Sequence, residues 1–223
     1  MSGLGAWLYL SPPSFLRVQE IVVLSPLKHL SEFDLVRLSQ VQKGDPLLRL
    51  SLSKMRSTIL RYPWIREVHL SKRFPGRLLI EVVEEEAVAL LALEGLEGFY
   101  LVNRDGKVFK KMGAQDPKNF PIVTGLSQED LTPLKEVLSL AHFFEVNKPV
   151  GDAGLSEIHW KGEEGVSVFT ADPCVRIDLG ARPWEGKLSR LSVAWESIMS
   201  ATKKPKVVDL SLRKRIIVKH ATL

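Results

Sequence analysis

The sequence contains a single cysteine, Cys174, among its 223 residues. One cysteine excludes an internal disulfide and a multi-cysteine metal site, and we expect its thiol to be buried or half-buried. The five histidines are scattered, without the H-E-x-x-H spacing of a zinc site. Phosphate-binding loops, dinucleotide-binding glycine motifs and nucleophile elbows are also missing. We therefore expect no cofactor, no metal, no small-molecule substrate and no catalytic centre.

Long hydrophobic runs are missing too. A membrane-spanning helix needs about 20 apolar residues, and the N-terminal run from Leu4 to Leu10 is interrupted by Ser11-Pro12-Pro13-Ser14. This segment also lacks the basic start and the small-residue cleavage site of a signal peptide. As it stands, the run is too short to span a membrane.

The composition is that of an ordinary folded protein, with 45% hydrophobic and 26% charged residues. The length fits one large domain or two of about 100 residues. The net charge of +5 permits an anionic partner such as a membrane surface or nucleic acid. The charges are dispersed along the chain, however, so we interpret the balance mainly as a solubility feature.

The clearest local pattern lies between Arg61 and Ala89. Residues 65–72 and 78–83 alternate apolar and polar side chains on either side of Phe74-Pro75-Gly76, which predicts an antiparallel hairpin. Pro63 ends the helical pattern that precedes the hairpin, because its ring does not fit a helix interior.

Upstream of this hairpin the sequence predicts a strand over residues 18–24 and two short helices. Ser31 caps the first helix, and the second, after a break at residues 43–46, carries the apolar stripe Leu52, Met55 and Ile59. The order strand, helix, helix, strand, strand is complete by Glu84. We interpret Glu84-Glu85-Glu86 as a solvated linker between domains rather than as a metal or catalytic carboxylate cluster.

The remaining residues predict a β-rich region with two helices. The helices are marked by Leu131, Leu134, Leu138 and Ala141, and by Leu188, Leu191, Trp195 and Ile198. The expected strands cover residues 87–93, 99–103, 108–110, 156–161, 166–170, 175–179, 207–212 and 216–218. The fold class is therefore α+β.

These patterns resemble the FtsQ/DivIB family of bacterial cell-division proteins, which carry a POTRA domain followed by a β domain. In the POTRA part the matching residues are Pro63, Trp64, Ile65, Val68, Leu70, Lys72, Pro75, Leu78, Ile80, Val82, Glu84, Val88 and Ala89, whereas Ala87 replaces a family proline. In the β domain the similar segments are residues 101–109, 121–125, 175–180, 187–188 and 208–210, with departures at Asn103 and Ser211.

The resemblance implies a POTRA-like β-α-α-β-β domain at residues 17–84, then a larger mixed β-sheet domain with two helices at residues 85–223. Residues 1–16 are then the remnant of a transmembrane helix or a linker, since the family has one such helix before its POTRA domain. Our hypothesis is a truncated or mis-started chain, which an upstream frame without an apolar run would contradict. The implied location is the inner membrane at the division septum, with most of the chain in the periplasm.

A protein of this kind is expected to act by offering surfaces, and we expect a partner strand to pair with an open sheet edge. The predicted edge is Leu212, Arg213, Lys214, Arg215, Ile216, Ile217 and Val218, for which an ordinary charged hairpin turn is the alternative. The resemblance implies that FtsB/FtsL-like single-pass coiled-coil proteins bind there. The helix at residues 184–199 is a second candidate contact face, although we expect Leu188, Leu191 and Trp195 to lie in the core.

Three other functions remain open at this point. A periplasmic POTRA module of an outer-membrane assembly or secretion factor would carry repeated POTRA units or a β-barrel, and neither pattern appears. A nucleic-acid-binding domain would need aromatic or arginine strips on one face, and the sequence predicts none. A cell-wall hydrolase would need paired carboxylates converging in a cleft.

Overall fold

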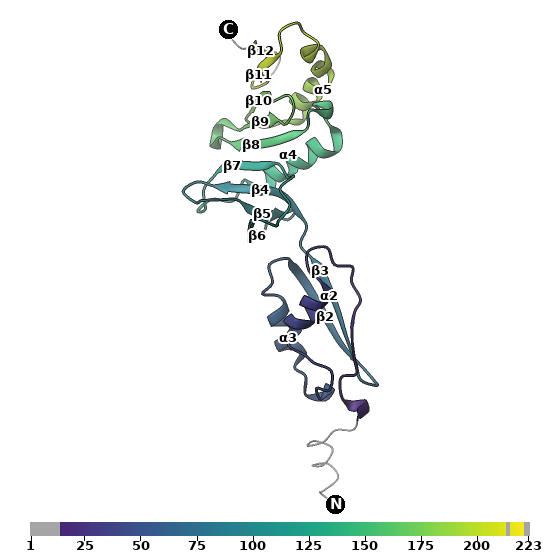
Figure 1. Ribbon diagram of the computed structural model, residues 1–223. Helices are drawn as coiled ribbons and strands as arrows, with labels where there is room; N and C mark the ends of the chain where they lie inside the picture. Colours follow the sequence, from purple (N-terminus) through teal and green to yellow (C-terminus); the bar gives the residue numbers. More distant parts are fainter. Residues whose placement is uncertain (1–13, 213–214, 221–223) are drawn as a thin grey trace, which may run out of the picture. The chain divides into compact units, whose positions relative to one another are not determined.

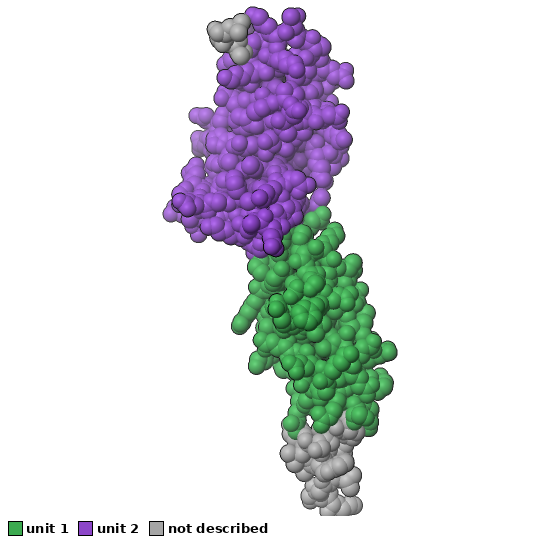
Figure 2. All heavy atoms as spheres, viewed as in Figure 1, with its two compact units in different colours: residues 1–86 green, residues 87–223 purple. Residues whose placement is uncertain are grey.

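The computed structural model describes residues 14–212 and 215–220. The chain forms two compact units, which divide between Glu86 and Ala87 (Figure 2). The buried core of unit 1 lies between Val18 and Val82, and that of unit 2 lies between Ala89 and Leu210. No described residue belongs to both cores, so each unit buries apolar surface of its own.

Unit 1 has the β-α-α-β-β order that the sequence predicts, and this prediction is confirmed. Its strands form a three-stranded sheet in the order β1-β3-β2, with β1 parallel and β2 antiparallel to β3. The elements are η1 (Ser14–Leu16), β1 (Glu20–Val23), α2 (Glu32–Ser39), η2 (Leu47–Arg49), α3 (Leu52–Ile59), β2 (Ile65–Arg73) and β3 (Arg77–Glu84) (Figure 1).

Local signals explain why these elements form where they do. The side chain of Ser31 accepts the N–H of Asp34 at the start of α2, and the side chain of Ser51 accepts the N–H of Lys54 at the start of α3. Alternate residues of β3, from Leu78 to Val82, are buried against the apolar sides of both helices. The helices thereby cover one face of the sheet, and the β3 side chains on the other face are exposed or half-buried.

The acidic triplet is part of unit 1 rather than a solvated linker, so that interpretation was wrong for its first two residues. The carboxylate of Glu84 accepts the backbone N–H groups of Lys28 and His29, at 2.9 and 3.2 Å. Glu85 is 2% exposed, and its N–H donates to the carbonyl of Trp64. The partners lie up to 56 residues away in sequence, which a local pattern cannot reveal.

Unit 2 is a single mixed sheet of nine strands with two long helices. The strand order is β12-β11-β10-β9-β8-β7-β4-β5-β6, with parallel pairs at β4/β7, β7/β8 and β10/β11. The elements are β4 (Ala87–Leu93), β5 (Tyr100–Asn103), β6 (Val108–Lys111), β7 (Ile122–Leu126), α4 (Leu134–Asn147), η3 (Gly151–Ala153), β8 (Leu155–Trp160), η4 (Gly162–Glu164), β9 (Val166–Thr170), β10 (Arg176–Gly180), α5 (Glu185–Met199), β11 (Pro205–Asp209) and β12 (Ile217–His220) (Figure 1).

The sequence patterns identified both helices and every strand of this sheet except β7. That strand lies between β4 and β8, near the middle of the sheet (Figure 1). Its five residues include Gly125 and follow Pro121, so the segment lacks the long alternation that marks its neighbours. The last two strands are also displaced from the expected ranges: β11 ends at Asp209, and β12 begins at Ile217.

Cys174 is exposed, which corrects the expectation of a buried or half-buried thiol. It lies in the connection between β9 and β10, where the hydroxyl of Thr170 accepts the N–H of Val175 and donates to the carbonyl of Pro173. These bonds close the turn through polar atoms, so the thiol is not needed for packing. Within the described part of the chain, none of the helices combines the length and the apolar character needed to cross a membrane.

Candidate partner-binding edge

Strand β12 forms one end of the nine-stranded sheet. It pairs with β11 in antiparallel register, with Val208 opposite Val218 and Asp209 opposite Ile217. Among residues 14–212 and 215–220, no strand pairs with its other side. A terminal strand of this kind leaves backbone donors and acceptors open to another polypeptide.

The pairing of β11 decides which backbone groups of β12 are open. The N–H of Leu210, the residue after β11, donates to the carbonyl of Asp178 on β10 at 2.8 Å. Successive residues of a strand direct their backbone groups to opposite sides. Asp209 therefore directs its N–H and C=O toward β12, where it faces Ile217.

The same alternation continues along β12. Ile217 and Lys219 direct their backbone groups toward β11, and Val218 and His220 direct theirs to the open side. The edge thus offers two N–H donors and two C=O acceptors within the four residues of the strand. Their spacing suits an extended segment of a partner.

The side chains of β12 differ between the two faces of the sheet. Val218 is half-buried opposite Val208, which is fully buried in the core, and Ile216 packs against the same core. Ile217 points to the other face and is 38% exposed. A partner strand here would meet apolar side chains on both faces of its own backbone.

The predicted edge residues do not all lie on the strand. Ile217 and Val218 belong to β12, whereas Leu212, Arg215 and Ile216 lie in the connection from β11. Arg213 and Lys214 lie outside the described residues. The carbonyl of Leu212 accepts a long hydrogen bond of 3.5 Å from Arg190 on α5. The sequence interpretation missed Lys219 and His220, because it ended the strand at Val218.

Positive charge surrounds this edge. Among the described residues, the exposed lysine and arginine side chains of β11, β12 and their connections are Lys203, Lys204, Lys206, Arg215 and Lys219. The carboxylate of Asp209, the described acidic group on the last two strands, already accepts the N–H and hydroxyl of Ser211. The edge is therefore complementary to an acidic segment. The sequence does not show that Lys204 and Lys206 lie near this edge, because that depends on β11 being the neighbour of the terminal strand β12.

Helix α5 does not offer its apolar stripe to a partner. Leu188, Leu191 and Trp195 are all at most 7% exposed and lie in the core of unit 2, as expected from the sequence. Val193, on the outer side, is 85% exposed. Any contact with this helix would use the outer side instead.

On β7 and β8, a hydroxyl lies within hydrogen-bond distance of both a carboxylate and an imidazole. Thr124 donates its hydroxyl proton to Glu157 at 2.6 Å and contacts Nδ1 of His159 at 2.8 Å. With the hydroxyl proton directed to Glu157, the Thr124 oxygen accepts from Nδ1 of His159 in the tautomer that carries its proton there. In the described ranges, no three His, Cys, Asp or Glu side chains are grouped to hold a metal ion.

Comparison with known proteins matches each of the two units to a known domain family. Residues 16–85 match the POTRA domain of FtsQ type, and residues 92–211 match the C-terminal domain of the cell division protein FtsQ/DivIB. The chain belongs to the FtsQ/DivIB family of cell-division proteins. The second match ends at Ser211, before β12 begins.

Full-length relatives extend this similarity. The chain is 29% identical to the cell division protein FtsQ of Geotalea daltonii, over 98% of this chain and 81% of that protein. It is 32% identical to the FtsQ protein of Anaeromyxobacter sp. (strain K), over 90% of this chain and 69% of that protein. The similarity to a DivIB protein of Streptococcus pyogenes is partial: 33% identity over 48% of this chain and 28% of that protein.

Proposed function

We propose that this cell-division protein is non-catalytic and links membrane-anchored division proteins through contacts outside the cytoplasm. The partners we propose are FtsB/FtsL-like single-pass proteins with coiled coils. One of their extended segments would add to β12 as a further strand. Membership of the FtsQ/DivIB family supports the role in division. The open side of β12 is the observation that carries the mechanism.

The proposed binding site comprises the predicted edge and the two residues that complete the strand. Its members are Leu212, Arg213, Lys214, Arg215, Ile216, Ile217, Val218, Lys219 and His220. Four backbone bonds to Val218 and His220 would contribute about 2 to 6 kcal/mol, at about 0.5 to 1.5 each. Micromolar binding needs about 8 kcal/mol. Side-chain contacts with Ile217 and the basic residues must supply the difference, and they would also give specificity.

The proposed location is the inner membrane, with a single span and with both units in the periplasm at the division septum. An upstream reading frame that encodes an apolar run, with basic residues on its cytoplasmic side, would support it. The alternative was a POTRA module of an outer-membrane assembly or secretion factor. The match of residues 92–211 to the FtsQ/DivIB C-terminal domain favours the division protein instead.

The first experiment is co-purification from envelope fractions with a tagged chain. Ile217→Glu places a carboxylate on the proposed contact surface, and we expect the small coiled-coil partners to be lost. Val146→Glu is the matched control, because Val146 is 62% exposed on α4 in the same unit. Circular dichroism should be unchanged for both variants. Retention of the partners by Ile217→Glu would contradict this site.

A second pair of variants tests the backbone contact itself. Val218→Pro removes an N–H that points to the open side and leaves the bonds to β11 in place, a position where proline is tolerated. Val218→Ala shortens the same side chain but keeps the N–H. We expect the alanine variant to bind and the proline variant to lose binding. Equal binding by the two variants would contradict strand addition.

A further inference from the structure

Three segments far apart in the sequence meet at the end of unit 1 where β1 begins. The N–H groups of Gln19 and Glu20 both donate to the carbonyl of Gly76, in the turn between β2 and β3. The turn before η2 joins the same end, since the N–H of Gly44 donates to the carbonyl of Val18 at 2.7 Å. η1, the β2–β3 turn and the approach to η2 therefore form one surface.

Each of these segments exposes a large apolar side chain. Phe15 on η1 is 51% exposed, Leu48 on η2 is 61% exposed, and Phe74 in the β2–β3 turn is 59% exposed. None of the three belongs to the core of unit 1. Apolar side chains gathered from separate segments of one surface indicate a site of interaction.

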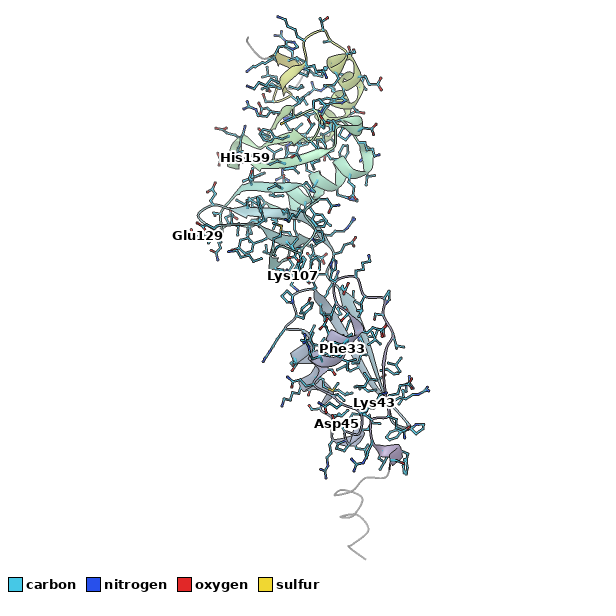
Figure 3. The ribbon with its side chains drawn as sticks, in the orientation of Figure 1. Phe33, Lys43, Asp45, Lys107, Glu129 and His159 are labelled. Carbon is cyan, nitrogen blue, oxygen red and sulfur yellow. The ribbon has the colours of Figure 1, made fainter. Side chains whose placement is uncertain are left out.

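Basic side chains accompany these three residues on the same segments. They are Arg17, Lys43, Arg49, Lys72, Arg73 and Arg77, which we call, together with Phe15, Leu48 and Phe74, the entry surface. Lys72 fixes η2 to β2, since its ammonium donates to the carbonyls of Leu48 and Leu50. Figure 3 labels Lys43 and Asp45 at this end of unit 1 and Phe33 farther from it.

The two acidic side chains next to the entry surface, Glu20 and Asp45, already have partners within unit 1. Glu20 forms an ion pair with Arg77 at 2.8 Å, and Asp45 accepts the N–H of Gln42 at 2.9 Å. Around the Glu84 end of the sheet, acidic side chains outnumber basic ones. The acidic residues are Glu32, Asp34, Glu67, Glu84, Glu85 and Glu86, and the basic residues are Lys28, Arg37, Arg61 and Arg66. Unit 1 is thus electrostatically polarised, with its positive end at the entry surface.

The combination of exposed apolar side chains and surrounding arginine and lysine matches the headgroup region of an anionic bilayer. Apolar side chains insert at the boundary of the acyl chains, while basic side chains remain at the phosphates. Nucleic acid could use the charges and could stack bases on Phe15 and Phe74, but Leu48 has no aromatic ring and would stay exposed to water.

We propose that the entry surface docks directly onto a bilayer that contains anionic phospholipid. The contact orients unit 1 on the membrane and is independent of the β12 edge, which belongs to unit 2. It is additional to any anchoring by the chain that precedes Ser14. Docking requires both kinds of side chain, because the charges select the anionic surface and the apolar residues hold the unit in the headgroup layer.

The first test is co-sedimentation of the full chain with vesicles of phosphatidylcholine, with and without 30% phosphatidylglycerol. Lys43→Glu/Arg73→Glu is the test variant, and Arg61→Glu/Arg66→Glu, away from the entry surface, is the matched control because it changes the net charge by the same amount. We expect the test variant to partition onto the anionic vesicles at least tenfold less than the wild type. The control and Ile217→Glu should bind as the wild type does, and binding should weaken as salt rises.

The second test reports which surface enters the headgroup layer, whatever the N-terminal residues contribute. In a Cys174→Ser background, an environment-sensitive fluorophore is attached to Phe74→Cys or, as the control, to Phe33→Cys. We expect fluorescence to increase on addition of anionic vesicles at position 74 and to stay constant at position 33. Equal responses at the two positions would overturn the proposal. Binding to soluble polyglutamate as tight as to the vesicles would also overturn it, because an acidic polypeptide would then match the surface equally well.

Discussion

At the scale of single residues, Glu84 joins the end of strand β3 to the segment between β1 and α2. It lies at the end of β3, and its oxygens hold the backbone N–H groups of Lys28 and His29 in the segment between β1 and α2. Tyr62 contributes a further bond from its hydroxyl to the carbonyl of His29. The segment is therefore fixed by side chains rather than by regular secondary structure.

Replacing Glu84 with alanine should destabilise unit 1 by about 1 to 2 kcal/mol, because charge-assisted bonds to two backbone donors are lost. Urea denaturation measures this loss, and hydrogen exchange of the amides at positions 28 and 29 should become faster. Glu86→Ala is the matched control, since Glu86 is exposed in the same triplet. If both variants lost the same stability, the role given to Glu84 would be wrong.

Asp178 on β10 makes the folding stability of unit 2 depend on pH. Burial works against its charged form, but hydrogen bonds from Ser167 and Arg176, with the charges of Lys161 and Arg176, outweigh that effect and lower the pKa of Asp178 below its ordinary value of 3.8. The unfolded chain then takes up this proton at a higher pH than the folded chain does. The stabilisation is complete above pH 3.8 and is lost as the pH falls through the lowered pKa.

Asp178→Asn should remove this contribution. The wild type should be the more stable protein at neutral pH, and the difference between the two should shrink once the pH falls below about 4. Urea denaturation at a series of pH values, followed by tryptophan fluorescence, measures the difference. Stability curves that stay parallel down to acid pH would show that Asp178 has no such role.

At the scale of the elements, Gly125 explains how β7 fits between β4 and β8. Its φ is +78°, and a Cβ atom at this position would lie 2.1 Å from the carbonyl oxygen of Trp160 on β8. Gly95, in the β4–β5 connection, has nearly the same φ of +76°, but nothing lies within 4 Å of an added Cβ. The two glycines therefore separate conformational strain from steric conflict.

We expect Gly95→Ala to destabilise unit 2 by about 1 to 2 kcal/mol, the strain of a side chain in the left-handed region. Gly125→Ala should destabilise it by about 3 kcal/mol or more, because the backbones of β7 and β8 must also separate. Thermal or urea denaturation of the two variants gives the comparison. Equal losses of stability in the two variants would mean that the steric conflict between a Cβ at position 125 and the carbonyl oxygen of Trp160 costs no additional free energy.

The elements that the sequence predicted well are those with local signals. Ser31 marks the start of α2 through a bond three residues away, and the apolar stripe Leu52, Met55 and Ile59 marks α3. The Pro75-Gly76 turn sets the hairpin of β2 and β3. β7 was missed because its identity depends on its neighbours in the sheet rather than on a pattern of its own. Glu84 was misread for the same reason, since its partners are distant in the sequence.

The candidate site could be predicted only in part. Alternation and basic residues near the C-terminus identified the region of Ile217 and Val218, but an edge is defined by which strands lie beside it. That information resides in the order of nine strands. The direction of the Val218 backbone groups depends further on the bond between Leu210 and Asp178, which no sequence pattern specifies.

At the scale of the whole molecule, each unit has its own buried core and its own proposed interaction surface. The entry surface belongs to unit 1, and the β12 edge belongs to unit 2. The N–H of Glu85 closes unit 1 by its bond to Trp64, and Ala87 starts the sheet of unit 2 directly afterwards. Because no described residue contributes to both cores, the stability of each unit should not depend on the other.

We therefore expect residues 87–223 to fold alone and to capture the small coiled-coil partners as well as the full chain does. All nine strands, both long helices and the buried core of unit 2 lie within this segment. Hydrogen exchange should protect the same strands in the fragment and in the full chain, and vesicle binding should be lost, since the entry surface is missing. The same fragment with Ile217→Glu is the control for partner capture. A fragment with unprotected strands would show that unit 2 needs residues before Ala87, whereas a folded fragment that fails to capture the partners would place part of their site in unit 1.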